Sequence, residues 1–153
     1  MFKIYFPRCD QVPVDLSSSL PAPPRGGTET ILLVDDATPL RMLTKLILEN
    51  AGYTVLDSGD PTQALEMALD YKGGLPLMIT DVVMPGFSGL VLADRLSVIR
   101  PETRMLYTSG FADDAIAKHG ISHPDRTFLE KPFNRNDLIR TVREILDAGQ
   151  RET

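Results

Sequence analysis

Five short apolar runs, each bounded by polar or turn-forming residues, divide the central part of the chain. Runs of this length indicate strands that are buried on both faces, as in a parallel sheet, rather than strands with one solvent-exposed face. Between the runs, apolar residues recur every three or four positions, which is typical of amphipathic helices. The predicted strands are residues 31–34, 53–56, 77–80, 104–108 and 127–130.

The segments between these strands carry signals for the start and end of a helix. Pro39 and Pro61 stand where the first two helices would begin, and Gly52 follows the first helix. The third helix is predicted at residues 90–99, before Pro101. The buried positions predicted for the first helix are Leu40, Leu43, Ile47 and Ala51, and those for the second are Ala64, Leu65, Ala68 and Leu69.

The last part of the chain predicts one short and one long helix. Residues 113–119 provide about two helical turns, and His123-Pro124 disfavours their continuation. Asn134 is a candidate cap for the last helix. The buried positions predicted for that helix are Leu138, Val142, Ile145 and Leu146. Five strand–helix units with short connections predict a right-handed α/β fold.

Charged side chains follow three of the predicted strands. Asp35 and Asp36 come after the first strand, Asp81 after the third and Lys131 after the fifth. A single Asp at a strand end is commonly only a turn former or a helix cap. The carboxyl ends of parallel strands lie along one edge of a sheet, however, so these four side chains are expected to converge. Three carboxylates and an ammonium group form a site for a hard divalent cation and a phosphate.

The order of these residues resembles a known family. Ser109 in the sequence YTSGF and Pro132 directly after Lys131 complete a pattern over residues 30–148 that resembles the receiver (response-regulator) domain of two-component phosphorelay systems. The resemblance implies a doubly wound five-stranded parallel sheet of the (βα)5 flavodoxin-like type, with strand order 2-1-3-4-5. It also implies a conformational switch or relay in signal transduction.

The resemblance assigns Mg²⁺ and phosphate chemistry to the acidic residues. Asp81 would accept a phosphoryl group from a phosphohistidine of a histidine kinase or a phosphotransfer protein. Mg²⁺ would be bound directly by Asp36, Asp81 and the backbone oxygen of Val83, and by Asp35 through water. A backbone ligand explains why an apolar residue can stand at position 83.

Four further residues receive roles from the same resemblance. Lys131 and Ser109 would bind oxygens of the transferred phosphoryl group. Ser109 would then move inward, and Phe128 on the last strand would follow as the second part of a switch. Phe128 as an ordinary core residue remains an equal alternative. The bond before Pro132 is expected to be cis, which X–Pro bonds reach at a cost of only about 0.5–1 kcal/mol.

Composition narrows the possible partners. The chain has 153 residues and a net charge of −5 without a basic run, which argues against direct nucleic-acid binding. No apolar run approaches the roughly 18 residues needed to span a bilayer, so no membrane contact is expected for this fragment. The single Cys9 allows no internal disulfide, in keeping with a cytoplasmic location.

The N-terminal part differs from a receiver domain. Residues 1–8, MFKIYFPR, resemble the last strand of the ATP-binding domain of sensor histidine kinases, and residues 9–27 have the Pro, Ser and Gly content of a linker. Residues 28–149 would be the receiver and 150–153 a tail. The expected context is therefore the C-terminal receiver of a hybrid sensor histidine kinase, with a stand-alone single-domain response regulator as the alternative.

Two other functions stay open at this point. The receiver itself would catalyse only its own phosphorylation and dephosphorylation, whereas a full-length parent would be a histidine kinase. A Mg²⁺-dependent phosphatase of the haloacid-dehalogenase type needs a second Asp two positions after the nucleophile, where this chain has Val83. A pseudo-receiver that works without phosphorylation is disfavoured by the intact acidic residues, Ser109 and Lys131.

Overall fold

A computed structural model gives the structure of the protein and describes residues 25–110 and 126–151. Three predicted features lie outside these ranges: the strand in residues 1–8, most of the linker over residues 9–27, and the short helix over residues 113–119. Within the described ranges, no helix is both long enough and apolar enough to cross a lipid bilayer.

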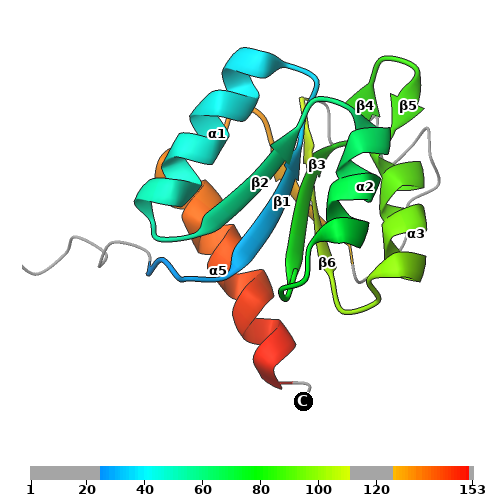
Figure 1. Cartoon of the computed structure of the whole chain (residues 1–153). Coiled ribbons are helices and arrows are strands. Elements are labelled where there is room, and N and C mark those ends of the chain that lie inside the picture. Colours follow the sequence, from blue (N-terminus) through cyan, green and yellow to red (C-terminus); the bar gives the residue numbers. More distant parts are fainter. Residues whose placement is uncertain (1–24, 111–125, 152–153) are drawn as a thin grey trace, which may run out of the picture.

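A five-stranded parallel sheet forms the centre of the molecule (Figure 1). Its strands are β1 (Thr30–Val34), β2 (Thr54–Ser58), β3 (Leu77–Asp81), β6 (Arg104–Ser109) and β7 (Thr127–Glu130). They are arranged in the order β2-β1-β3-β6-β7. The predicted fold class and strand order are therefore confirmed, and β2 extends two residues beyond its predicted end.

The helices cover both faces of the sheet. In Figure 1, α1 (Thr38–Asn50) and α5 (Arg135–Arg151) lie on one face, and α2 (Pro61–Asp70) and α3 (Gly89–Ile99) lie on the other. Alternate residues of β1 and β3 enter two separate cores, as the period of two along a strand requires. Leu32 and Met78 pack with α2 and α3, whereas Leu33 and Ile79 pack with α1 and α5.

The buried faces of the helices agree only partly with the predictions. All four predicted positions of α5 are buried, and the Asn134 side chain accepts a hydrogen bond from the backbone N–H of Asp137 at 2.8 Å. The predictions for Leu43 and Leu69 are wrong, because these side chains are 54% and 57% exposed. In α1 the predicted Ile47 and Ala51 pack against the core, but the fully buried positions are Thr44 and Leu48.

Pro85, Gly86 and Gly89 predict a loop after Asp81, but this segment contains a small antiparallel hairpin. Strands β4 (Val83–Met84) and β5 (Phe87–Ser88) pair across Pro85 and Gly86, and Gly86 has a φ of 71° that favours glycine. Ser88 then caps α3 by accepting a hydrogen bond from the N–H of Leu90 at 3.2 Å. This hairpin connects the end of β3 to α3.

The end of the predicted linker contacts the folded domain. The N–H of Gly27 donates a hydrogen bond to the carbonyl oxygen of Ala51 at 3.2 Å. A Cβ atom built on Gly26 would lie 1.9 Å from that same oxygen, so a larger residue does not fit there. The chain therefore meets the C-terminal end of α1 before it enters β1.

Candidate functional site: an acidic cluster at the carboxyl edge of the sheet

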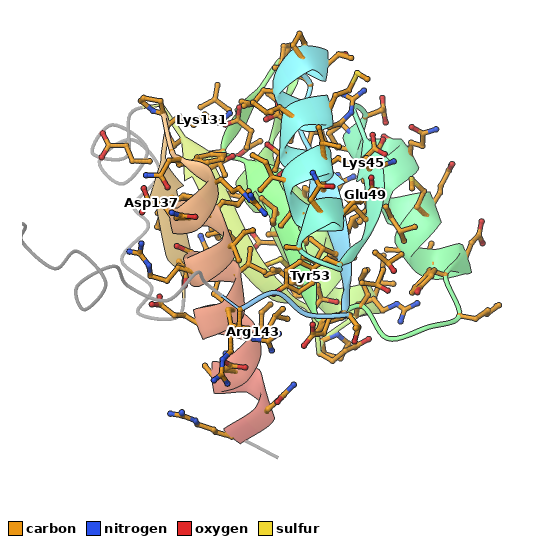
Figure 2. All side chains as sticks on the ribbon, turned by 90° about the vertical axis from the view of Figure 1, so that its left-hand side faces the viewer. Lys45, Glu49, Tyr53, Lys131, Asp137 and Arg143 are labelled. Atoms are coloured by element: carbon orange, nitrogen blue, oxygen red, sulfur yellow. The ribbon has the colours of Figure 1, made fainter. Side chains whose placement is uncertain are left out.

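The charged residues predicted from the sequence do converge at one edge of the sheet. Asp81 ends β3 and pairs in register with Thr108 on β6, and Ser109 pairs with Glu130 on β7, directly before Lys131. In Figure 2, Lys131 lies near the top of the view, whereas Arg143, which pairs with Glu29 just before β1, lies well below it. Strand register alone thus brings the acceptor candidate, the hydroxyl and the ammonium group together.

Three carboxylates form the centre of the site. One oxygen from each of Asp35, Asp36 and Asp81 lies within 4.8 Å of the others. Asp35 is buried, Asp81 is half-buried and Asp36 is exposed. Carboxylate oxygens are the preferred ligands of Mg²⁺, and like charges held this close need a cation to offset their repulsion. The donor set therefore fits a hard divalent cation.

Asp35 is held by the surrounding structure through both its backbone and its side chain. Its N–H donates to the carbonyl oxygen of Ser58 at 3.2 Å, and its carbonyl oxygen accepts from Nη1 of Arg41 at 2.7 Å. Its Oδ1 accepts from the N–H of Ala37 at 2.8 Å, and its Oδ2 lies 3.3 Å from Nζ of Lys131. Asp35 is thus a fixed part of the cluster.

Lys131 provides the positive charge of the site. Its Nζ lies 3.0 Å from Oδ2 of Asp81 as well as 3.3 Å from Oδ2 of Asp35. Its backbone N–H donates to the carbonyl oxygen of Ser109 at 2.8 Å, which fixes the start of the segment after β7. The Lys131–Pro132 bond is cis, as the family resemblance implies. Lys131 therefore bridges two of the three carboxylates.

The backbone around Asp81 is packed too tightly for any side chain at position 89. A Cβ atom on Gly89 would lie 2.0 Å from the carbonyl oxygen of Asp81 and 3.0 Å from Oγ1 of Thr80. Oδ1 of Asp81 accepts from the N–H of Val83 at 3.2 Å, and the Val83 side chain is 68% exposed. The sequence marks Gly89 only as one of the turn-forming residues after Asp81, because no local signal reveals a close approach between two backbones.

Ser109 and Phe128 lie on the neighbouring strands β6 and β7. Ser109 is 5% exposed at the end of β6. Phe128 is partly buried and stacks on Tyr107, with ring centroids 5.2 Å apart and an interplanar angle of 27°. Burial raises the pKa of Tyr107. Arg126 covers the Tyr107 ring, with Cζ 5.9 Å from the centroid. The contact between Tyr107 and Phe128 was not predicted, because it depends on the register of two strands.

A second charged group lies on β2 and α1, next to the acidic cluster. Asp57 accepts hydrogen bonds from Nζ of Lys45 at 2.7 Å and from Nε of Arg41 at 3.2 Å. The hydrogen bond from Lys45, with a further contribution from Arg41, lowers the pKa of Asp57. No signal in the sequence identified this group, because Asp57 on β2 lies 16 residues after Arg41 and 12 residues after Lys45, which are both on α1.

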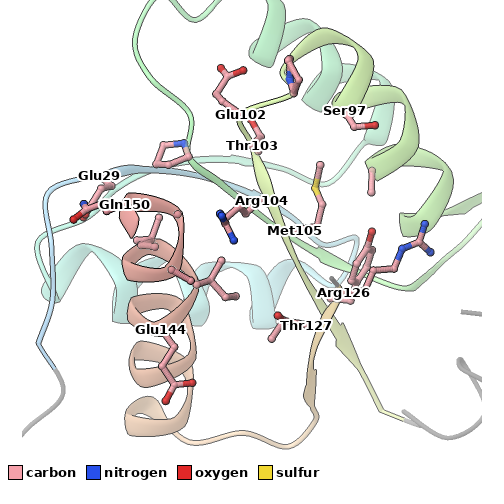
Figure 3. A pocket seen from close by; sticks show the side chains of 18 of the residues that line it. Glu29, Ser97, Glu102, Thr103, Arg104, Met105, Arg126, Thr127, Glu144 and Gln150 are labelled. Carbon is pink, nitrogen blue, oxygen red and sulfur yellow. The ribbon is translucent and has the colours of Figure 1, made fainter. Parts of the chain in front are cut away.

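A cavity of about 1060 Å³ lies elsewhere, between α3, β6, β7 and the end of α5 (Figure 3). Glu29, Thr103 and Gln150, near the amino-terminal edge of the sheet, are among the residues that line it. It shares no lining residue with the acidic cluster, so its size does not make it the candidate site.

Comparison with known proteins gives a consistent result. The model of the family described as "Response regulator receiver domain" matches residues 31–143. The sensor kinase CckA of Brucella abortus is 33% identical over 154 residues, a match that covers 95% of this chain and 16% of CckA. The response regulator receiver protein CpdR of the same organism is 32% identical over 119 residues, covering 78% of this chain and 98% of CpdR.

The solved structures agree with these matches. The crystal structure of the receiver domain of the hybrid histidine kinase CckA superposes with a TM-score of 0.65 at 29% identity, covering 76% of this chain and 98% of that domain. The chain thus corresponds to about a sixth of the length of one relative and to nearly all of another.

Proposed function

Since this chain belongs to the response regulator receiver domain family and acts as a phospho-accepting domain, we propose that Asp81 is the residue that accepts the phosphoryl group. The observation that carries the proposal is the Lys131 ammonium, which lies 3.0 Å from Oδ2 of Asp81 at the edge of the sheet. Asp35 already has four interactions that fix it. Asp81 is half-buried at the end of the central strand β3, and it pairs in register with Thr108, the residue before Ser109.

The metal site follows from the carboxylate cluster. Receiver domains bind Mg²⁺, and here Asp36, Asp81 and the carbonyl oxygen of Val83 would be the direct ligands, with Asp35 acting through water. When bound, the ion would neutralise charge on the transferred phosphoryl group. Val83 suits this role because its side chain is exposed and its N–H already bonds to Asp81, so the backbone lies close to the acceptor.

In the transfer step, a carboxylate oxygen of Asp81 attacks the phosphorus atom of a phosphohistidine in line with the bond that breaks. The new bond is the P–O bond of an acyl phosphate, and the broken one is the P–N bond, whose electron pair leaves with the imidazole. Lys131 would leave its ion pairs with the carboxylates to bind one phosphoryl oxygen. The Ser109 hydroxyl would bind another.

The same chemistry provides a switch. An acyl phosphate on Asp81 adds negative charge at the end of β3, and this charge would draw the Ser109 hydroxyl toward it. Movement of Ser109 would alter the space behind β6. Phe128 would respond, since it already packs in the neighbouring core against Tyr107. The switch would thus reach the surface of β6 and β7.

The context that we propose is the C-terminal receiver of a hybrid sensor histidine kinase, on the cytoplasmic side. Only about 8 of the 153 residues fall outside the 95% match to CckA, so the similarity extends into residues 1–24, before the family match begins at residue 31. The stand-alone alternative is favoured by the 98% coverage of CpdR. Histidine kinases and phosphotransfer proteins are the partners of this family.

Phosphorylation by acetyl phosphate tests the role of Asp81. We expect the wild-type protein with Mg²⁺ to gain one hydroxylamine-labile phosphoryl group by intact-mass spectrometry, and Asp81→Asn to gain none. Asp94→Asn is the matched control, because Asp94 is an exposed acid on α3 outside the cluster. A labile adduct that persists in Asp81→Asn would place the acceptor elsewhere.

A further inference from the structure

Arg41 contacts the acidic cluster from α1 through its guanidinium group. Nη1 donates to the carbonyl oxygen of Asp35 at 2.7 Å, and Nε donates to Oδ2 of Asp57 at 3.2 Å. The Arg41 side chain is only 16% exposed. Because a guanidinium group is a rigid fork, the bond to Asp57 fixes the direction in which Nη1 points. Arg41 therefore donates a well-oriented hydrogen bond to one backbone oxygen, that of Asp35.

That oxygen belongs to the peptide group that joins Asp35 to Asp36. A peptide group is planar, so a bond to its oxygen also fixes the orientation of the following N–H and Cα, which belong to Asp36. Among the described residues, we find no hydrogen bond or ion pair to the Asp36 carboxylate itself. The direction of the Asp36 side chain therefore depends on its backbone.

Gly59 supplies independent support, because it leaves the space in which the guanidinium lies. A Cβ atom on Gly59 would be 2.6 Å from Nη1 and 3.3 Å from Cζ of Arg41. Gly59 is not among the described residues with a positive φ, so its backbone does not itself require glycine. The lack of a side chain at position 59 instead keeps Arg41 in contact with Asp35.

We propose that Arg41 is a positioning residue for the metal site, which orients the Asp35–Asp36 peptide group and thereby raises the affinity for Mg²⁺. This inference rests on the proposed function, since it concerns the same metal site. It assigns to Arg41 no contact with metal or phosphate. Groups that orient metal ligands commonly change metal affinity 10- to 100-fold, and we expect about tenfold here.

The sign of the effect separates positioning from simple electrostatics. Arg41 is a cation close to a site for a cation, so removal of its charge alone would tighten Mg²⁺ binding. Loss of an orienting bond would weaken binding. Arg41→Gln removes both the charge and the fork, whereas Arg41→Lys keeps the charge and removes the fork. We expect weaker Mg²⁺ binding in both variants.

The experiment is a Mg²⁺ titration of the metal-free protein, followed by the amide NMR shifts of Asp36 and Val83. We expect the dissociation constant to rise about tenfold in Arg41→Gln and in Arg41→Lys. Lys45→Gln is the matched control: Lys45 also binds Asp57 from α1, but no hydrogen bond joins it to Asp35. Its dissociation constant should stay within twofold of wild type.

Gly59→Ala tests the same inference without a change of charge. The added methyl group should displace the guanidinium and raise the dissociation constant in the same direction. In Arg41→Gln/Gly59→Ala the second change should add nothing, since the contact is already lost. This variant also covers the case in which Arg41→Gln does not fold, which a urea titration of each protein would reveal.

The outcomes distinguish the inference from the proposed function. If the wild-type shifts do not respond to Mg²⁺, the metal site itself is refuted. If wild type binds Mg²⁺ and the Arg41 or Gly59 variants bind it equally well or more tightly, the role of Arg41 is refuted and the metal site stands. A tenfold loss in Lys45→Gln would also refute the inference, because the effect would then belong to Asp57.

Discussion

Replacement of Asp36 by Asn should stabilise the metal-free protein. Asp36 lies within 4.8 Å of the Asp35 and Asp81 carboxylates, and Lys131 pairs with both of those groups. The two carboxylates and one ammonium carry a net charge of −1. For an exposed Asp36, a unit charge at this distance in a medium of dielectric constant 80 gives about 0.9 kcal/mol of repulsion. Asp36→Asn removes it and should raise the free energy of unfolding by about 1 kcal/mol.

Urea unfolding in buffer with a metal chelator measures this difference, and thermal unfolding should show a rise in Tm of about 4 °C for a domain of this size. Mg²⁺ should reverse the order of the two proteins. At ten times the dissociation constant, bound Mg²⁺ stabilises the wild type by about 1.4 kcal/mol. Asp36→Asn loses a proposed ligand and should gain much less.

The control for a general effect of net charge is Glu66→Gln, on the exposed face of α2. It lowers the negative charge of the chain by the same amount, away from the cluster. An unchanged or lower urea midpoint for Asp36→Asn without metal would refute the repulsion argument. An equal rise in Glu66→Gln would show that the effect has no connection with the site.

Three further predictions follow from the contacts. Gly89→Ala should lower the free energy of unfolding by about 1–3 kcal/mol through its clash with the Asp81 carbonyl, measured by urea titration, while Gly74→Ala, with open space around it, should not. Asp57→Asn should cost about 1 kcal/mol at pH 7; because ion pairing lowers the pKa of Asp57 below 3.8, this cost should shrink as the pH falls through the lowered value. A pH-independent cost would contradict that assignment. Deletion of residues 1–24 should leave the Tm and the phosphorylation by acetyl phosphate unchanged, and a fall in Tm of more than about 5 °C would contradict the linker assignment.

The strand order and the composition of the site could be predicted from the sequence for one physical reason. Parallel strands buried on both faces are continuous apolar runs, and their carboxyl ends share an edge. Asp35, Asp81 and Lys131 each follow such a run, so their convergence required only the topology. The family resemblance supplied that topology, which spacing alone does not determine.

Contacts that depend on the relative placement of two elements were not predictable in this way. The fit of Gly89 against the Asp81 carbonyl arises where β3 and the start of α3 meet. The Tyr107–Phe128 stack depends on the register of two strands. Neither contact produces a periodic pattern in its own segment, and therefore neither can be predicted from one segment alone.

The orientation of α1 about its axis differs from the one that its apolar pattern predicts. Residues in a helix advance by about 100°, so Arg41, Thr44, Lys45 and Leu48 share one side of α1. Arg41 and Lys45 reach Asp57, and Thr44 and Leu48 are buried. That arrangement leaves Met42, Leu43 and Leu46 on the opposite side, where they are 64%, 54% and 54% exposed. The spacing of leucines predicted a buried Leu43. A pattern of apolar residues does not take into account that a charged residue, here Arg41, can lie on the buried side of a helix. The side of α1 from which Arg41 contacts Asp35 and Asp57 is thus also its buried side, so the apolar side chains on the opposite side face outward.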